Sequence, residues 1–233
     1  RIALITGASR GIGAAVAERL ANEGAHVIAV ARTVGGLEEL DDRIQAAGGT
    51  TTLVPLDVTD FEGLDRLGGA VAERWGKLDI LVGNAAILGS LSPMGHIKPD
   101  VWEKVMAVNA NANFRLIRSF DPLLRASDAG RAMFVTSGVA KGGFAYWGGY
   151  AASKAALECM VTTWAAELNK TAVRANLVEP GIVRTAMRAA AMPGEDPSTL
   201  PEPADITDVF IDLADPACSR NGERLVVVPP EQN

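Results

Sequence analysis

Histidine and cysteine are scarce in this chain of 233 residues, and their scarcity excludes several kinds of site. The only histidines are His26 and His96, and the only cysteines are Cys159 and Cys218. A metal site built from these side chains has too few ligands, so we predict no metal. A Ser–His–Asp hydrolase would depend on one of the two histidines. His26 begins an apolar run and His96 lies in a Pro- and Gly-containing loop, so we interpret both as structural.

Basic clusters and long apolar runs are also lacking. The chain has 22 Lys and Arg against 28 Asp and Glu, a net charge of −6, and its basic residues are scattered. This distribution argues against a nucleic-acid partner. No apolar run approaches the roughly 20 residues that span a bilayer, so we expect no membrane insertion. Two cysteines make no disulfide framework, and we expect a cytoplasmic protein. Because Arg1 stands where a native chain has Met, we also expect a short segment to precede it.

Short apolar runs alternate with longer amphipathic segments along the whole chain. The expected strands cover residues 2–6, 26–31, 51–58, 78–85, 131–137, 173–180 and 223–228. The expected helices cover residues 12–23, 37–47, 61–75, 99–127, 149–168 and 204–213. Strands that are apolar on both faces need helices on both sides. We therefore predict an α/β fold, a single doubly wound, Rossmann-type domain over residues 1–233 with about seven parallel strands. Residues 187–203, rich in Ala, Pro, Gly and Asp, form either a disordered connector or a mobile lid.

A glycine-rich turn follows the first expected strand. It reads Thr6-Gly7-Ala8-Ser9-Arg10-Gly11-Ile12-Gly13 and leads directly into a helix. Such glycines allow a sharp turn, a close approach of the backbone to a pyrophosphate, and tight packing of helix on sheet. The free N–H groups of the helix then face the phosphates. The turn predicts a dinucleotide cofactor.

The residues at the end of the second strand indicate which nicotinamide cofactor binds. An NAD enzyme usually places Asp or Glu there to hold the ribose 2′-hydroxyl. Here the chain reads Val30-Ala31-Arg32-Thr33, and Arg10 lies within reach in the glycine turn. Two guanidinium groups suit a 2′-phosphate, so we predict NADP(H) in preference to NAD(H). The alternative is that both are solvated surface arginines.

Tyr150 and Lys154 form a candidate reacting centre. They are one helical turn apart in the segment YAASKAALECM, so they share a face. A neighbouring ammonium is expected to lower the pKa of the tyrosine and make it a better acid–base. Ser137 lies at the end of the fifth strand, where ligands bind in doubly wound sheets.

These motifs together resemble the short-chain dehydrogenase/reductase family across essentially the whole chain. The matching features are the turn at 6–13, Asp57-Val58, Gly83-Asn84-Ala85-Ala86, Asn109, Ser137, Tyr150 with Lys154, and Pro180-Gly181 followed by Thr185. Two positions depart from the family pattern Asn-Asn-Ala-Gly: Gly83 replaces the first residue and Ala86 the last. We expect the methyl group of Ala86 to reshape the adenosine half of the cofactor site.

The resemblance implies a role for each residue. Tyr150 exchanges a proton with the substrate oxygen, Ser137 stabilises that oxygen, Lys154 binds the nicotinamide ribose, and Asn109 holds a proton-relaying water. Asp57 contacts the adenine, Asn84 lies beside the adenosine ribose, and Thr185 with the backbone near Ile182 and Val183 holds the carboxamide. The full set of expected cofactor-binding residues is Gly7, Ser9, Arg10, Gly11, Ile12, Gly13, Arg32, Asp57, Val58, Asn84, Tyr150, Lys154, Pro180, Gly181, Val183 and Thr185.

The resemblance also implies a small carbonyl or alcohol substrate and a homo-dimer or homo-tetramer packed through helices 99–127 and 149–168. Phe144 and Trp147 either line the substrate pocket or simply pack their loop, and we expect Arg184 and Arg188 to be solvated or paired rather than to bind substrate. The favoured function is an NADP(H)-dependent carbonyl reductase or alcohol dehydrogenase. The alternatives are a 3-oxoacyl-[acyl-carrier-protein] reductase, which should need a basic pocket mouth, and a non-catalytic NADP(H)-sensing protein.

Overall fold

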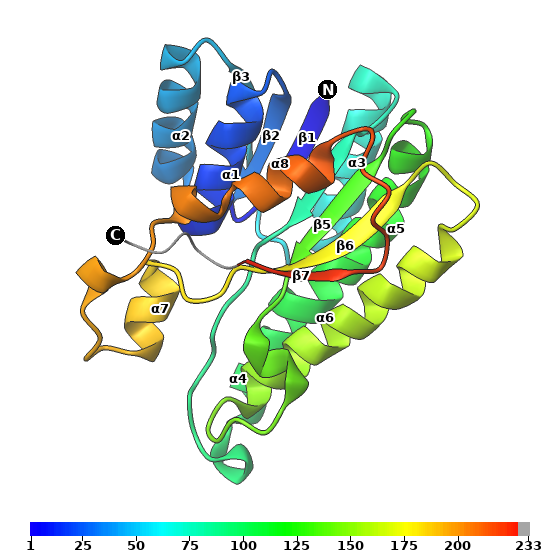
Figure 1. Ribbon diagram of the computed structural model, residues 1–233. Coiled ribbons are helices and arrows are strands. Elements are labelled where there is room, and N and C mark those ends of the chain that lie inside the picture. Colours follow the sequence, from blue (N-terminus) through cyan, green and yellow to red (C-terminus); the bar gives the residue numbers. More distant parts are fainter. Residues whose placement is uncertain (228–233) are drawn as a thin grey trace.

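The computed structural model describes residues 1–227, and its strands form one parallel sheet (Figure 1). The strands are β1 (Ile2–Thr6), β2 (His26–Ala31), β3 (Thr50–Pro55), β4 (Ile80–Gly83), β5 (Arg131–Val135), β6 (Arg174–Glu179) and β7 (Arg224–Val226). Their order is β3-β2-β1-β4-β5-β6-β7, and every neighbouring pair is parallel. The predicted α/β fold with a doubly wound sheet is confirmed. The last expected strand reached residue 228, which lies outside the described residues.

Helices cover both faces of this sheet. They are α1 (Gly11–Asn22), α2 (Val34–Ala46), α3 (Phe61–Trp75), α4 (Pro99–Met106), α5 (Ala112–Arg125), α6 (Gly148–Glu167), α7 (Ala186–Ala191) and α8 (Asp208–Ala214). Figure 1 shows α1, α2 and α8 in front of the sheet and α3, α5 and α6 behind it. No helix within residues 1–227 combines the length and the apolar character needed to cross a membrane.

Two apolar cores, one on each face, hold these layers together. The front core joins α1, α2 and α8 to the sheet through residues such as Leu20, Leu40 and Phe210. The rear core joins α3, α5 and α6 through residues such as Phe120 and Phe134. Because strand residues alternate between the two faces, strands β1 to β6 each contribute to both cores, which explains their nearly continuous apolar runs.

The sheet order reverses direction between β1 and β4, and this switch opens a crevice at the carboxyl ends of the strands. Residues 56–58, 84–85 and 136–137 were expected to belong to strands, but they leave the sheet here. They line the crevice, and the apolar residues among them, such as Leu56 and Val58, extend the strand pattern beyond the sheet. The expected helix 99–127 is likewise α4 and α5 joined by a π-helical segment, η2 (Ala107–Asn111).

Residues 187–203 are not structureless. They contain most of α7 and a short 3₁₀ turn, η4 (Pro197–Thr199), and another 3₁₀ turn, η5 (Pro203–Ile206), follows. The interpretation as a disordered connector is therefore wrong, and the lid interpretation stays a prediction.

The opposite, amino-terminal edge of the sheet is held by a buried arginine. Arg131 begins β5, is 4% exposed, and donates to four main-chain oxygens, those of Gly130, Ala172, Asp215 and Pro216. Gly130 lies just before β5, Ala172 lies just before β6, and Asp215 and Pro216 follow α8. One buried guanidinium therefore joins three parts of the chain through their main-chain oxygens.

We expect Arg131→Met to lower the free energy of unfolding by about 3 kcal/mol, because it removes four hydrogen bonds that a buried, charged side chain donates. Urea denaturation followed by circular dichroism measures this. Arg66→Met is the matched control, since Arg66 is 68% exposed, and it should change stability by less than about 0.5 kcal/mol. Equal effects of the two substitutions would contradict this account of Arg131.

Candidate active site

A cavity of about 560 Å³ opens at the carboxyl edge of the sheet. It is lined by almost all of the expected site residues: Gly7, Ser9, Arg10, Gly11, Ile12, Arg32, Asp57, Val58, Asn84, Ser137, Tyr150, Lys154, Pro180, Gly181, Val183 and Thr185. Only Gly13 and Asn109 of the expected set do not line it, and both contact residues that do. Segments far apart in the sequence thus meet at one edge. Within residues 1–227, no three His, Cys, Asp or Glu side chains cluster in a way that could hold a metal ion.

The glycine turn closes one end of the cavity. Gly7 and Gly11 have φ angles of +67° and +57°, a backbone conformation that residues with a Cβ rarely adopt. A Cβ on Gly13 would lie 2.2 Å from the Gly7 oxygen, so only glycine lets α1 approach the turn this closely. The Asn84 amide donates to the Thr6 oxygen at 2.9 Å and to the Gly7 oxygen at 3.3 Å. Asn84 therefore fixes the turn from β4, a contact that sequence reasoning missed.

Arg10 and Arg32 lie at the outer end of the cavity, beyond β1 and β2. Arg32 Nη1 is 3.5 Å from Asp57 Oδ2, and both side chains are substantially exposed. Burial raises the pKa of Asp57, but hydrogen bonds from Thr59 and the Arg32 charge outweigh it and hold that pKa below its usual value. No ion pair is found for Arg10 among the described residues. The glycine turn and the two guanidinium groups fit a dinucleotide that carries an additional phosphate.

Tyr150 and Lys154 lie on the buried side of α6 and face the cavity. Lys154 is 1% exposed, its Nζ donates to the Val135 oxygen at 2.7 Å, and it lies 5.8 Å from the Tyr150 ring centroid. Burial lowers the pKa of Lys154 to about 8, against the opposing charge of Glu158. Burial raises the pKa of Tyr150 to about 12, against a hydrogen bond from Ser137.

The expectation that the ammonium lowers the pKa of Tyr150 is therefore wrong for these residues. Desolvation of the phenolate outweighs every favourable contact, since Tyr150 is only 9% exposed. Trp147 adds to this burial, because its ring packs edge-on against Tyr150 at a centroid distance of 6.1 Å. Burial therefore favours the protonated form of Tyr150 at neutral pH.

Asn109 is fully buried in the π-helical segment and does not line the cavity. Its Oδ1 accepts from the Ile87 nitrogen, and its Nδ2 donates to the Ile87 oxygen and to Ser153 Oγ, all at 2.9–3.0 Å. The Ser153 hydroxyl in turn donates to the main-chain oxygen of Tyr150 at 2.7 Å. Asn109 therefore joins the loop after β4 to α6. π-Helical bulges are frequent at functional sites, and the relay role of Asn109 stays a prediction.

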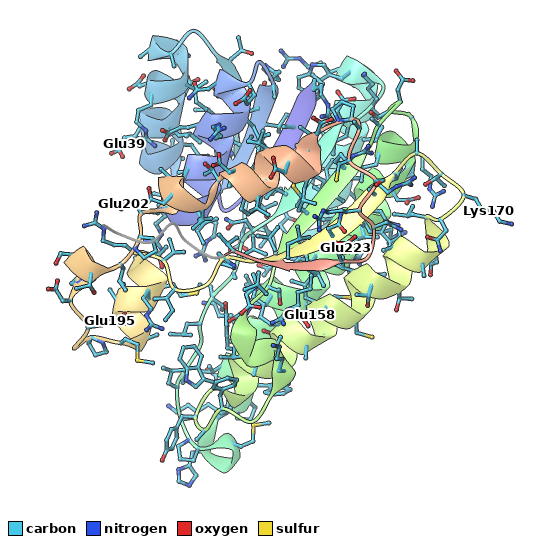
Figure 2. The ribbon with its side chains drawn as sticks, in the orientation of Figure 1. Glu39, Glu158, Lys170, Glu195, Glu202 and Glu223 are labelled. Atoms are coloured by element: carbon cyan, nitrogen blue, oxygen red, sulfur yellow. The ribbon has the colours of Figure 1, made fainter. Side chains whose placement is uncertain are left out.

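The segment after β6 forms the far wall of the cavity and continues into α7. Thr185 caps α7 by accepting from the Arg188 nitrogen at 3.1 Å. Arg188 forms two contacts of 2.6 Å with Glu195, and Arg184 pairs with Glu202. Figure 2 shows Glu195 and Glu202 on the segments beside α7. The expectation that both arginines are paired or solvated is confirmed.

Comparisons with known proteins agree with this geometry. A family model described as short chain dehydrogenase matches residues 1–196. The oxidoreductase YciK of Escherichia coli K12 is 41% identical over 214 residues, which cover 91% of this chain and 84% of that protein. A short chain dehydrogenase from Shigella flexneri 2a, solved in complex with NADP, has a TM-score of 0.93 at 39% identity and covers 97% of this chain and 96% of its own. The FabG 3-oxoacyl-[acyl-carrier-protein] reductase of Vibrio harveyi is 33% identical over 236 residues, 97% of this chain and 95% of FabG.

The chain belongs to the short-chain dehydrogenase/reductase family. It is therefore an NAD(P)-dependent oxidoreductase.

The structure explains one departure of this dehydrogenase from the family pattern. A Cβ on Gly83 would lie 2.3 Å from Phe134 Cδ1 and 2.6 Å from Asn113 Oδ1. Phe134 is fully buried in β5, beside β4, and fills the space that a side chain at position 83 needs. The Phe134 ring therefore fits beside β4 only because position 83 has no side chain. Ala86, the other departure, lines the cavity as expected, and its effect on cofactor binding stays a prediction.

We expect Gly83→Ala to lower the free energy of unfolding by about 2 kcal/mol, because overpacking a tight core displaces Phe134. Thermal and urea denaturation measure the loss. Ala86→Gly, which restores the family residue in the exposed cavity wall, should cost less than about 1 kcal/mol. The double variant Gly83→Ala/Phe134→Leu should recover part of the loss. A stable Gly83→Ala protein would refute the packing argument.

Proposed function

We propose that this dehydrogenase is an NADPH-dependent reductase of carbonyl compounds. The observation that carries the proposal is that Tyr150, Ser137 and Lys154 line the same cavity as two arginines suited to a 2′-phosphate. When bound, NADPH would supply the hydride. The protein's part is to bind, orient and exclude water, and to deliver one proton.

The side chains at the inner end of the cavity divide this work. Tyr150 donates its proton to the substrate oxygen, and the Ser137 hydroxyl stabilises the charge that develops on that oxygen. Lys154 offers its ammonium to the ribose hydroxyls, and Asn109 holds the water that passes protons outward. Ser137 and Tyr150 both line the cavity, so both hydroxyls can reach one substrate atom there.

The preference for NADPH over NADH rests on the end of β2. The chain there presents Arg32 in place of a carboxylate, and Arg10 lies across the same end of the cavity. A carboxylate would repel a 2′-phosphate, whereas a guanidinium binds it through paired hydrogen bonds. The Shigella flexneri relative was solved with NADP, which supports this choice.

The substrate end of the cavity favours an uncharged, apolar carbonyl compound. It is lined by Ile87, Leu88, Trp147, Ile182 and Met187. Arg184 and Arg188 also reach this end, but Glu202 and Glu195 neutralise them. A buried anion would need to displace one of these carboxylates at an energetic cost.

A second candidate is a 3-oxoacyl-[acyl-carrier-protein] reductase, which the similarity to Vibrio harveyi FabG favours. Such an enzyme docks an acidic carrier on a basic surface beside its pocket. The two arginines beside α7 are paired with carboxylates, so they offer little attraction to an acidic partner. A non-catalytic NADP(H) sensor is less well supported, since Asn109, Ser137, Tyr150 and Lys154 are all present.

We also propose a homo-dimer or homo-tetramer packed through α5 and α6. Phe114 on α5 is 51% exposed, and the outer side of α6 exposes Ala155, Cys159 and Ala166 with little charge. Such surfaces are typical of faces that pack against another copy. Light scattering should give a mass of two or four chains, and a monomer at micromolar concentration would contradict the proposal.

Tyr150→Phe should lower the turnover of an apolar ketone with NADPH by at least about a hundredfold, because the proton donor is lost. The dissociation constant of NADPH, measured by its fluorescence, should change less than about threefold. The substrate panel would include a diketone, a quinone, a steroid ketone, a keto-sugar and a 3-oxoacyl thioester. Undiminished turnover by the variant would refute the role of Tyr150, and fastest turnover of the thioester would favour the second candidate.

Replacing Arg10 and Arg32 with alanine should each weaken NADPH binding by about tenfold, since each removes a charged hydrogen bond to the 2′-phosphate. NADH binding should change less than about threefold, because NADH lacks that phosphate. Isothermal titration with both cofactors measures the two constants. Arg43→Ala, which removes an arginine of α2 paired with Glu18, is the control. An equal loss for NADH and NADPH would contradict the assignment.

A further inference from the structure

A group of charged side chains lies directly behind the reacting centre, and of these only Lys154 was identified from the sequence. Glu158 lies one turn beyond Lys154, on the side of α6 that faces the sheet edge (Figure 2). Its Oε1 accepts from the Thr136 hydroxyl at 2.6 Å and lies 2.9 Å from Arg224 Nε. Lys154 itself binds the oxygen of Val135. Two consecutive residues at the end of β5 are thus tied to α6.

Arg224 of β7 holds the next residue of the same segment. Its Nη2 donates to the main-chain oxygen of Ser137 at 3.1 Å and lies 2.8 Å from Glu179 Oε2. The side chains of Arg224, Glu158 and Glu179 are 19%, 22% and 14% exposed, so water screens them little. A Cβ on Gly138 would lie 2.7 Å from Glu179 Oε1. The carboxylate therefore packs against the peptide that follows Ser137.

The charges of this group alternate in sign. Lys154, Glu158, Arg224 and Glu179 follow one another as cation, anion, cation and anion, so together they carry no net charge when ionised. Among the described residues, Arg224 Nε and Glu179 Oε2 have no aligned hydrogen-bond partner, so their contacts are held by charge. The Glu158 carboxylate belongs to α6 and the Glu179 carboxylate to β6. The planar guanidinium of Arg224, with its several N–H groups, reaches both carboxylates and the Ser137 carbonyl at once.

We infer that Arg224 and Glu158 are positioning residues that fix the Ser137 hydroxyl against Tyr150. Ser137 follows β5 and Tyr150 lies on α6, so their separation depends on what joins these two elements. Glu158 joins them through Thr136, and Arg224 fixes the Ser137 peptide against the carboxylates of α6 and β6. The inference rests on the proposed function, in which these two hydroxyls act on one substrate oxygen.

The test compares Arg224→Gln and Glu158→Gln with Arg220→Gln. Arg220 lies shortly before β7, is 56% exposed and pairs with Glu223, so it is a matched control. Turnover of the ketone is measured per NADPH-binding site. The Tyr150 side chain is followed by ¹³C NMR of ring-labelled tyrosine, because the chain has only two tyrosines and the other, Tyr146, is exposed. The signal of the ring carbon that carries the hydroxyl responds to the surroundings of that hydroxyl, which include Ser137.

We expect Arg224→Gln and Glu158→Gln to lower kcat by about tenfold or more, since small misplacements at a reacting centre are costly. The KM for NADPH should change less than about threefold. The Tyr150 signal should move in both variants, while the Tyr146 signal stays in place. Arg220→Gln should leave all of these unchanged. Arg224→Lys, which keeps the charge but not the fork, should restore part of the turnover and move the Tyr150 signal part of the way back.

A purely structural role would give a lower melting temperature with unchanged kcat per binding site and an unchanged Tyr150 signal. That result would overturn the inference. If Arg224→Gln does not fold, the inference is tested with Glu158→Gln and Arg224→Lys, again by kcat per binding site and by the Tyr150 signal. If the unaltered protein reduces no carbonyl compound, the proposed function fails, and the Tyr150 signal, which needs no substrate, still decides whether the group positions Ser137.

Discussion

The burial of the Lys154 ammonium is the constraint on which the active-site end of this protein depends. An ammonium removed from water needs compensating partners, because desolvation of a charge costs far more than one hydrogen bond returns. The Val135 oxygen supplies one partner at 2.7 Å, and Glu158 supplies opposite charge. Both demands place α6 against the end of β5. Since Tyr150 is on the same helix, the position of the proposed proton donor follows from the same packing.

Burial acts in opposite directions on the two neighbouring groups. It raises the pKa of Tyr150 to about 12 and lowers that of Lys154 to about 8. Both shifts favour the neutral form, since a low-dielectric surrounding disfavours any charge. The Tyr150 phenol therefore keeps its proton, and Lys154 holds its proton less tightly than a lysine in water does. A site built this way is suited to deliver a proton to a carbonyl oxygen, and its strength as a base depends on charges brought by what it binds.

The sequence predicts those parts of the structure whose cause is local. The bounds of β1 and β2 were correct, because apolar runs there end at a glycine turn and at Arg32. The glycine turn and the Tyr150–Lys154 pair were found for the same reason, since each lies within one short segment. The strands β3, β4 and β5 were drawn too long. Some of the residues beyond their true ends, such as Leu56, Val58 and Ala85, are apolar and line a cavity, and burial against a cavity leaves the same pattern as burial in a sheet.

Arg224 could not be predicted, because its partners come together only through the register of the sheet. Arg224 pairs with Leu177 across β6 and β7, which places it two residues from Glu179 on the same face. The pairing of β5 with β6 then brings both beside the segment that holds Ser137. A shift of one residue in β7 would turn the guanidinium to the other face of the sheet. Glu158 did carry a local signal, one turn after Lys154, but a helical Lys–Glu spacing is usually a surface pair.

The arginines of the cavity show how the same residue type serves opposite purposes. At the outer end, Arg32 has only a 3.5 Å contact with Asp57, and both side chains remain exposed. At the inner end, Arg188 is held by Glu195 through two contacts of 2.6 Å, and Arg184 is held by Glu202. A weakly paired guanidinium can exchange its partner for a phosphate at little cost, whereas one bound bidentately cannot. This difference supports the proposed phosphate site at the outer end and the proposed uncharged substrate at the inner end, and it comes from the carboxylates around the arginines.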